Sequence, residues 1–344
     1  MLMRAVLELV RRLEAVDLGA ALVTLVTRHI SLFIPLTSKE RAVHYNRSTL
    51  VAQTTPQAER KDVSQPRDAS HGLKLSILIP VWNEETSIED IVRRVAGMDT
   101  SHLGVPVELE IICVDDASTD RTVDILHRLH GGPSEAPGEG QRGGLVDAQI
   151  PGLRVIRHSF NQGKGAGIRN ALIAATGDYC IIQDADYEYD PTDIPRLLEP
   201  VVNGKATVVY GARPLDGSGG RFIMDTGNRA LTVITNLLYG TRLHDMETCY
   251  KLLPTALLKS FNLQCSRFDM EPEITAKVRR SGHDIFEIPI RYYPRPPGQG
   301  GKKLSAQKDG LPALMALLRY RTWQPPTGAL QPDGLQKRQN VVST

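Results

Sequence analysis

The chain is poor in the features that define several classes of protein. It has only four cysteines among 344 residues, 5% aromatic residues and a formal net charge of +2. The cysteines are widely spaced without a C-x-x-C pair, which argues against a disulfide-stapled domain and favours reduced thiols. The nearly balanced charge argues against a nucleic-acid-binding protein. With 41% hydrophobic residues, the chain is long enough to bury a large core.

The sequence also lacks a long apolar run. Leu18–Val26 is followed by polar residues 27–29 before Ile30–Leu36 resumes, whereas a membrane span needs about 20 mainly apolar residues. Glu8 and Glu14 interrupt what would be the basic leader of a signal peptide. We therefore expect a cytoplasmic protein.

Two helical stripes are compatible with peripheral contact on the cytoplasmic face of a membrane. One holds Val6, Leu9 and Leu13 near the start of the chain, and the other holds Leu314 and Leu317 ahead of basic residues. Helices docked on the protein's own domain would show the same pattern. After the second stripe the sequence is polar and has no apolar span.

Changes in composition and in hydrophobic pattern divide the chain into four parts. Residues 1–50 are expected to be a helical extension, 51–72 a flexible linker, 73–321 a single catalytic domain and 322–344 a disordered tail. In the domain, short β-branched runs alternate with helical patterns, which is typical of an α/β fold with a mostly parallel central sheet flanked by helices. Strands are expected at Leu75–Ile79, Leu109–Val114, Leu153–Ile156, Tyr179–Gln183, Thr207–Tyr210, Tyr250–Leu253 and Ile285–Tyr292.

Polar and acidic residues follow three of these strands. The segments are 80–85 (PVWNEE), 115–120 (DDASTD) and 184–188 (DADYE). Ligands of parallel α/β sheets bind outside the carboxyl ends of the strands, so these acids are expected to meet at one edge. A single such cluster could equally be a set of helix caps.

The pair Asp184 and Asp186 predicts a site for a divalent cation. Two carboxylates on one turn can bind a hard cation through oxygen and leave positions open for substrate phosphates. Mg²⁺ or Mn²⁺ therefore fits better than zinc, with Glu188 as a candidate third ligand. Such a cation would stabilise a nucleoside diphosphate leaving group.

A glycine-rich basic segment at 161–170 (NQGKGAGIRN) opens a predicted helix. Lys164 and the helix N-terminus suit an anionic group. The segment lacks the Walker A frame, and no G-x-G-x-x-G follows the first strand. A tight turn with a solvated basic face is the structural alternative.

Together these motifs resemble the family 2 glycosyltransferases, in the branch of the dolichol-phosphate mannosyltransferases and their bacterial relatives. The resemblance covers residues 73 to about 321 and rests on several motifs in the family's order. They are 79–84 (IPVWNE), 114–120 (VDDASTD), 161–165 (NQGKG), 183–186 (QDAD), 245–251 (DMETCYK), 267–273 (RFDMEPE) and Lys302-Lys303. The resemblance implies a single A-type, Rossmann-like glycosyltransferase domain that inverts the anomeric carbon.

The resemblance also implies roles for individual residues. Nucleotide-sugar binding is expected of Pro80, Trp82, Asn83, Glu84, Asp115, Asp116, Lys164 and Asp184. Asp186, Asp245 and Arg213 are the expected catalytic residues, and Asp184, Asp186 and Glu188 the metal ligands. Acceptor and diphosphate binding is expected of Arg213, Arg229, Arg291, Lys302 and Lys303. Many relatives have Gln where Glu188 stands, so its place as a ligand departs from the family pattern.

The expected activity is transfer of a hexose from GDP-mannose or UDP-glucose to a polyprenyl or dolichyl phosphate. A phosphate monoester has a second pKa near about 6, so it is already a nucleophile at neutral pH. The alternative within the family is a saccharide or other hydroxyl acceptor, for which Asp245 could serve as base. A sugar nucleotidyltransferase would be expected to have a glycine-rich basic loop after the first strand, where this chain has residues 81–83 (VWN). A non-catalytic nucleotide-sugar-binding module is a further alternative.

Overall fold

A computed structural model describes residues 72–131, 149–214, 222–265, 267, 269–295 and 306–327. The chain divides into two units, Met1–Asp62 and Val63–Thr344, and all described residues belong to the second. The predicted extension, nearly all of the linker, Lys302, Lys303 and most of the tail lie outside the described residues. Within the described part of the chain, no helix is both long and apolar enough to cross a membrane.

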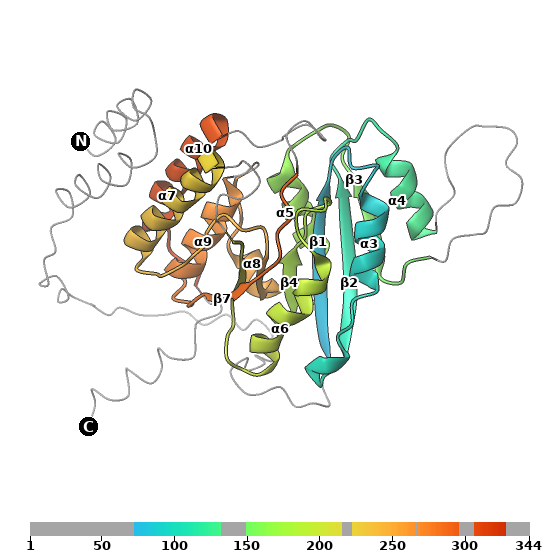
Figure 1. The fold of residues 1–344 in the computed structure, drawn as a ribbon, viewed down its shortest axis with the longest axis horizontal. Helices are drawn as coiled ribbons and strands as arrows, with labels where there is room; N and C mark the ends of the chain where they lie inside the picture. Colours follow the sequence, from blue (N-terminus) through green and yellow to red (C-terminus); the bar gives the residue numbers. More distant parts are fainter. Residues whose placement is uncertain are drawn as a thin grey trace, which may run out of the picture. The chain divides into compact units, whose positions relative to one another are not determined.

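The strands in the described part of the chain form one seven-stranded sheet (Figure 1). Its spatial order is β3-β2-β1-β4-β6-β5-β7, and every neighbouring pair is parallel except the two made by β6. The strands are β1 (Leu73–Val81), β2 (Val107–Asp115), β3 (Leu153–Arg157), β4 (Tyr179–Ile182), β5 (Val209–Ala212), β6 (Lys251–Pro254) and β7 (Phe286–Pro289). The prediction of a mostly parallel α/β sheet is confirmed.

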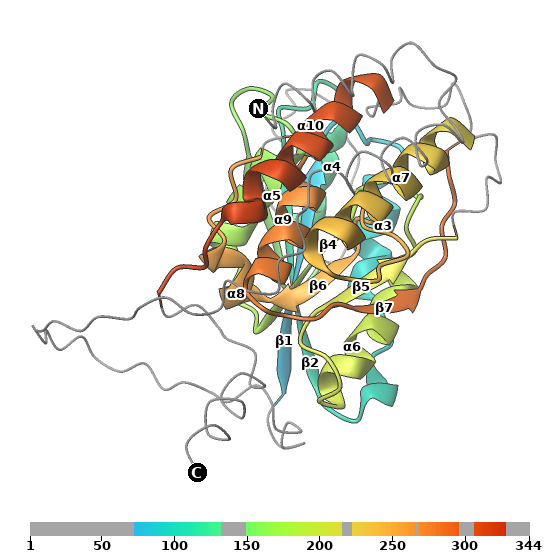
Figure 2. The same ribbon diagram turned by 90° about the vertical axis from the view of Figure 1, so that its left-hand side faces the viewer.

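Helices cover both faces of the sheet. Figure 2 shows α3 and α6 on one side and α5 and α8 on the other, with α7, α9 and α10 packed together at the β7 end. The helices are α3 (Ile88–Ala96), α4 (Thr122–His130), α5 (Lys164–Ala174), α6 (Ile194–Val202), α7 (Phe222–Tyr239), α8 (Thr255–Ser260), α9 (Met270–Arg280) and α10 (Ala306–Arg319). Short 3₁₀ turns are η1 (Ser101–Leu103), η2 (Pro191–Asp193) and η4 (Tyr320–Thr322).

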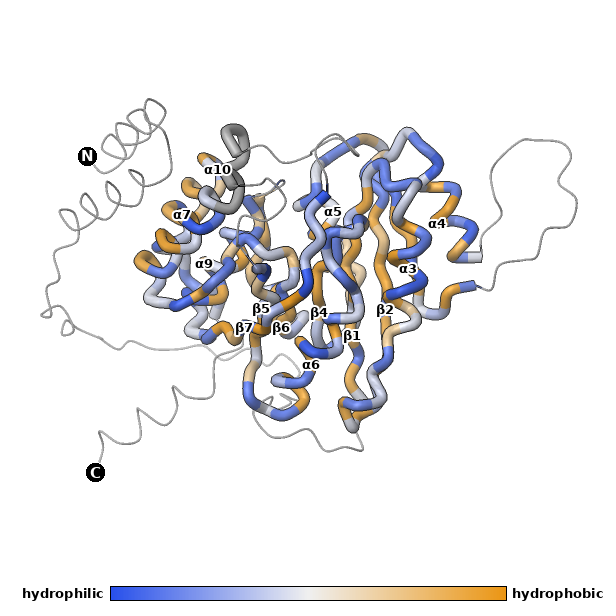
Figure 3. The backbone as a smooth tube through the Cα atoms, in the orientation of Figure 1, coloured by the Kyte–Doolittle hydropathy of each residue, from blue (hydrophilic) through white to orange (hydrophobic). Residues whose placement is uncertain are grey.

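The core lies on both faces of β1, β2 and β4. Ile77 and Ile79 of β1 and Ile112 of β2 are completely buried, and β1 and β2 appear hydrophobic along much of their length in Figure 3. Strands buried on both faces read as continuous apolar runs, which is why they were recognisable in the sequence. Helix α3 buries Ile88, Ile91, Val92 and Val95, which recur at helical spacing.

The sequence prediction left the direction of one strand open and placed the end of another too late. Strand β6 runs antiparallel between β4 and β5, with Cys180 opposite Leu253 and Val209 opposite Leu252. Strand β7 ends at Pro289 instead of Tyr292, because the chain leaves the sheet there. Tyr292 instead makes an isolated antiparallel bridge with Tyr189.

Candidate active site

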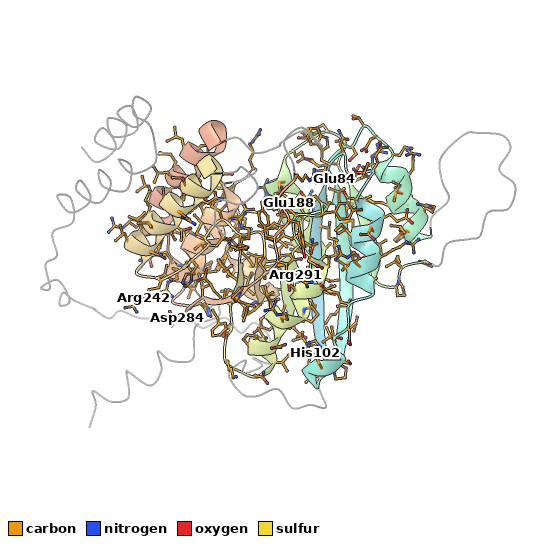
Figure 4. All side chains as sticks on the ribbon, in the orientation of Figure 1. Glu84, His102, Glu188, Arg242, Asp284 and Arg291 are labelled. Carbon is orange, nitrogen blue, oxygen red and sulfur yellow. The ribbon has the colours of Figure 1, made fainter. Side chains whose placement is uncertain are left out.

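The acidic segments that follow β1, β2 and β4 lie at the same edge of the sheet. These three strands are parallel neighbours, with Pro80 beside Val114 and Leu78 beside Ile182. In Figure 4, Glu84 and Glu188 lie toward one end of the strands and His102 at the other. The expectation that the three acidic segments converge is therefore confirmed.

The loops after β1 and β2 hold each other in place. Asn83 has a φ of 51° and Ala117 a φ of 58°, both in the left-handed region. The backbone N–H of Asn83 donates to Ser118 Oγ at 2.9 Å, and the N–H of Thr119 donates to Asn83 Oδ1 at 2.8 Å. Asparagine tolerates this conformation better than most residues. Asn83 is thus a structural clamp at the edge where the sequence predicted a nucleotide.

Asp115 and Asp116 are directed into the protein. Asp115 is completely buried and accepts the N–H of Ser118 at 3.2 Å. Asp116 accepts the N–H groups of Gln162 and Gly163 at 2.8 and 2.7 Å. Gly163 has a φ of 91°, which favours glycine, and α5 begins at the next residue. Asp116 therefore positions the start of α5, whereas direct nucleotide contact by either residue stays a prediction.

Lys164, the first residue of α5, joins two acidic groups. Its Nζ lies 2.9 Å from Asp184 Oδ1 and 3.0 Å from Glu271 Oε1 of α9. Burial alone would lower the pKa of Lys164, but the neighbouring charges of Asp184, Cys249 and Glu271 outweigh it and raise that pKa well above its usual value. Lys164 is a permanent cation beside the first of the two predicted metal ligands.

Asp184 and Asp186 have opposite pKa shifts. Burial opposes ionisation of Asp184, but the Lys164 ammonium prevails and lowers its pKa. Burial and the charge of Asp184 raise the pKa of Asp186 to about 7, although Arg295 acts in the other direction. The two carboxylates are close enough to repel each other, and such repulsion is relieved when a divalent cation binds between them.

This donor set fits a hard divalent cation bound by two protein carboxylates. Among the described residues there is no group of three His, Cys, Asp or Glu side chains arranged to hold a metal. Glu188, the predicted third ligand, accepts from Tyr292 Oη at 3.0 Å and from the backbone N–H of Arg295 at 3.1 Å. Both of its oxygens are thus engaged, and direct ligation by Glu188 stays a prediction. Substrate phosphates and water would supply the remaining ligands.

Arg295, in the segment after β7, also belongs to this site. Its guanidinium contacts both oxygens of Glu84 at 3.0 and 2.9 Å and Asp186 Oδ2 at 2.8 Å. It thereby connects the segment after β7 to the ends of β1 and β4. Such a guanidinium can exchange carboxylates for phosphate oxygens when a ligand enters.

Arg213, which follows β5, forms a two-pronged ion pair with Asp245. The Nε–Oδ2 distance is 2.6 Å and the Nη2–Oδ1 distance 2.9 Å, and both side chains are nearly fully buried. The guanidinium also lies 5.2 Å from the centroid of the Tyr292 ring. Burial opposes the charge of Arg213, but the interactions with Tyr189 and Asp245 hold its pKa well above the usual value. Asp245 therefore orients a buried cation.

The other predicted residues are more dispersed. Trp82 is 38% exposed at the end of β1, beside the half-buried Pro80. Arg229 is exposed on α7. Arg291 is held at η2, where it pairs with Asp190 and Asp193 at 3.1 Å each. These contacts give Arg291 a structural role, and its acceptor contact stays a prediction.

The comparisons with known proteins agree with one another on the kind of enzyme that this chain resembles. Residues 76–261 match glycosyl transferase family 2. Dodecaprenyl-phosphate galacturonate synthase of Rhizobium johnstonii is 26% identical over 231 residues, which cover 67% of this chain and 62% of that enzyme. UDP-N-acetylglucosamine–dolichyl-phosphate N-acetylglucosaminyltransferase of Methanococcus voltae is 26% identical over 223 residues, or 62% of this chain and 84% of the relative. The chain thus spans less than two thirds of the rhizobial protein.

A solved structure shares the fold. Glucosyl-3-phosphoglycerate synthase from Mycobacterium tuberculosis, crystallised with Mg²⁺ and UDP, superposes with a TM-score of 0.51 at 20% identity. The match covers 79% of this chain and 87% of that one. At this identity the likeness concerns the architecture alone.

Proposed function

Since the match extends over more than half of its length, the chain belongs to glycosyl transferase family 2, and we propose that it transfers a hexose from a nucleotide diphosphate sugar to a polyprenyl phosphate. The observation that carries this proposal is the pair Asp184 and Asp186, in which burial and the charge of Asp184 raise the pKa of Asp186 to about 7. GDP-mannose and UDP-glucose are the donors we would test first. The names of the rhizobial and methanococcal relatives support the lipid phosphate as acceptor class.

In this proposal Asp184 and Asp186 hold a divalent cation together with the donor diphosphate. The cation would supply Lewis-acid stabilisation of the departing nucleoside diphosphate. Lys164 lies beside Asp184 and Arg295 beside Asp186, so each can neutralise charge on the diphosphate. Glu84 holds the Arg295 guanidinium when phosphate is absent.

The acceptor phosphate would be received by Arg213. An oxygen of the acceptor phosphate would attack the anomeric carbon of the donor sugar. A bond would form between that carbon and the acceptor oxygen, and the bond to the diphosphate oxygen would break with inversion. A phosphate monoester needs no general base for this step. The ion pair between Asp245 and Arg213 supports this acceptor class, because both carboxylate oxygens are already bound to the guanidinium. A hydroxyl acceptor would need Asp245 to abstract a proton. For that, Asp245 would have to give up its contact with Arg213.

A lipid acceptor also implies work at a membrane surface, and we propose the cytoplasmic face. Donor nucleotides are water-soluble, whereas a polyprenyl chain stays in the bilayer. The protein would therefore bind one substrate from each phase, as peripheral enzymes do.

Nucleoside diphosphate release from a panel of GDP- and UDP-sugars would test the proposal. The assay is run with Mg²⁺ or Mn²⁺, with and without a short-chain polyprenyl phosphate. Release that one donor shows only with the lipid phosphate supports the proposal and identifies the sugar. Release stimulated by a saccharide or another soluble acceptor, and not by the lipid, would overturn the lipid assignment.

A further inference from the structure

Two glutamates near the site carry carboxyl oxygens without a hydrogen-bond partner. They are Glu247, in the loop before β6, and Glu271, in the first turn of α9. Glu247 Oε1 and Glu271 Oε2 are both buried and unpartnered. Leaving a buried carboxyl oxygen without a partner costs free energy, so such atoms commonly receive a ligand or a water.

The loop that carries Glu247 is firmly built, so its orphaned oxygen is not a sign of a poorly packed segment. The buried Nζ of Lys251 donates to the carbonyls of Met246 and Thr248 at 2.7 Å each. The N–H of Met246 donates to Thr232 Oγ1, and the N–H of Cys249 donates to Tyr189 Oη. The backbone on both sides of Glu247 is therefore anchored.

Each of the two glutamates adjoins one of the two phosphate-binding groups of the proposed function. On one side, Glu271 shares the Lys164 ammonium with Asp184. On the other side, Glu247 stands two residues from Asp245, which pairs with Arg213. In an in-line displacement the transferred sugar sits between the leaving diphosphate and the acceptor phosphate. The two glutamates are therefore the candidates for contact with the transferred sugar.

We propose that Glu247 and Glu271 bind hydroxyl groups of the transferred sugar, and that they select a neutral hexose over a hexuronate. Buried carboxyl groups without a partner are matched by sugar hydroxyls, which can both donate and accept. The carboxylate of a hexuronate brings only acceptors and a further negative charge. This inference rests on the proposed function, since it places the sugar by the positions of the two phosphates.

The electrostatics support the same selection. Burial and the nearby charge of Glu271 raise the pKa of Glu247 to about 8, although Lys251 and Arg213 act in the opposite direction. The position thus disfavours one more negative charge. A sugar carboxylate placed there would meet the same penalty that Glu247 itself meets.

The test measures binding and turnover with matched donors on the full chain. Affinities are compared for UDP, UDP-glucose and UDP-glucuronate, and for the GDP series if the protein prefers guanine. We expect the neutral donor to bind at least about tenfold more tightly than the hexuronate, and Glu247→Gln to lower kcat/KM for the neutral donor about ten- to a hundredfold. Affinity for UDP alone should stay within about twofold, because UDP has no sugar to contact Glu247.

Controls separate this role from a structural one. Glu108→Gln, at the other end of β2 and 70% exposed, should change none of these values. Glu271→Gln should repeat the loss of Glu247→Gln if it folds with an unchanged melting temperature. Equal use of hexuronate, or a Glu247→Gln variant with wild-type kcat/KM, would show that the orphaned oxygens bind water only and would overturn the inference alone. A chain that binds no nucleoside diphosphate would overturn the proposed function and the inference with it.

Discussion

Replacing Asp186 with Asn should make the metal-free protein more stable while it abolishes activity. Asp186 is partly buried beside Asp184, and the burial and the charge of Asp184 raise its pKa from 3.8 to about 7. The folded protein therefore opposes ionisation of a carboxyl that ionises freely in the unfolded chain. Asn has nearly the same shape and no charge, so it removes this penalty.

The size of the effect follows from the two pKa values. A raised carboxyl pKa lowers stability as the pH rises from about 4 to 7, since the unfolded chain loses its proton first. At about 1.4 kcal/mol for each pH unit, Asp186→Asn should raise the free energy of unfolding by about 2 kcal/mol at pH 5 and at most about 4 kcal/mol at pH 8. The salt bridge to Arg295, 2.8 Å long, is already included in the pKa.

Urea unfolding of wild type and variant at pH 5 and pH 8, in the presence of a chelator, measures this difference. Asp284→Asn serves as the control, because that side chain is 96% exposed (Figure 4) and its loss should alter stability by less than about 0.5 kcal/mol. A variant that is less stable than wild type at pH 8, or whose gain does not grow with pH, would refute the reasoning.

Three further outcomes are expected. Arg213→Lys keeps the charge but loses the two-pronged contact with Asp245. Steady-state kinetics should therefore show kcat with lipid phosphate reduced at least about tenfold and the donor affinity unchanged. An unchanged kcat would exclude Arg213 from acceptor binding. Asp116→Asn leaves one of the two backbone N–H donors before α5 without an acceptor. It should lower the free energy of unfolding, measured in urea, by about 1–3 kcal/mol. Wild-type stability of the variant would show that these two hydrogen bonds are dispensable. EDTA should stop nucleoside diphosphate release and Mg²⁺ or Mn²⁺ should restore it, whereas release that persists in EDTA would argue against a metal at Asp184 and Asp186.

The parallel part of the sheet could be predicted because its strands are continuous apolar runs, each followed by polar residues. Ile77, Ile112 and Ile181 are all completely buried, and this burial on both faces leaves a clear pattern in the sequence. The convergence of the acids after β1, β2 and β4 follows from parallel pairing alone. The antiparallel direction of β6 could not be predicted, since a four-residue apolar run carries no information on its partner.

The contacts of the site that could not be predicted join distant segments of the chain. Arg295 reaches Glu84 across 211 positions of sequence, and the sequence around it does not show which carboxylates it contacts. Glu271 lies on α9, whose residues 270–278 are all buried, so the helix has no polar face on which a functional acid would stand out. The unpartnered oxygens of Glu247 and Glu271 become visible only when tertiary contacts are known. Sequence patterns show which residues can be charged, and packing decides which charges are left for a ligand.

The central claim is tested most directly by following a labelled sugar from the nucleotide donor into the lipid fraction. Wild-type protein with a divalent cation and polyprenyl phosphate should produce labelled lipid, and a double variant with Asp184→Asn and Asp186→Asn should produce none while it remains folded. Equal labelling by the double variant would contradict a mechanism built on this carboxylate pair. Absence of lipid labelling by wild-type protein with every donor that it binds would contradict the proposed acceptor.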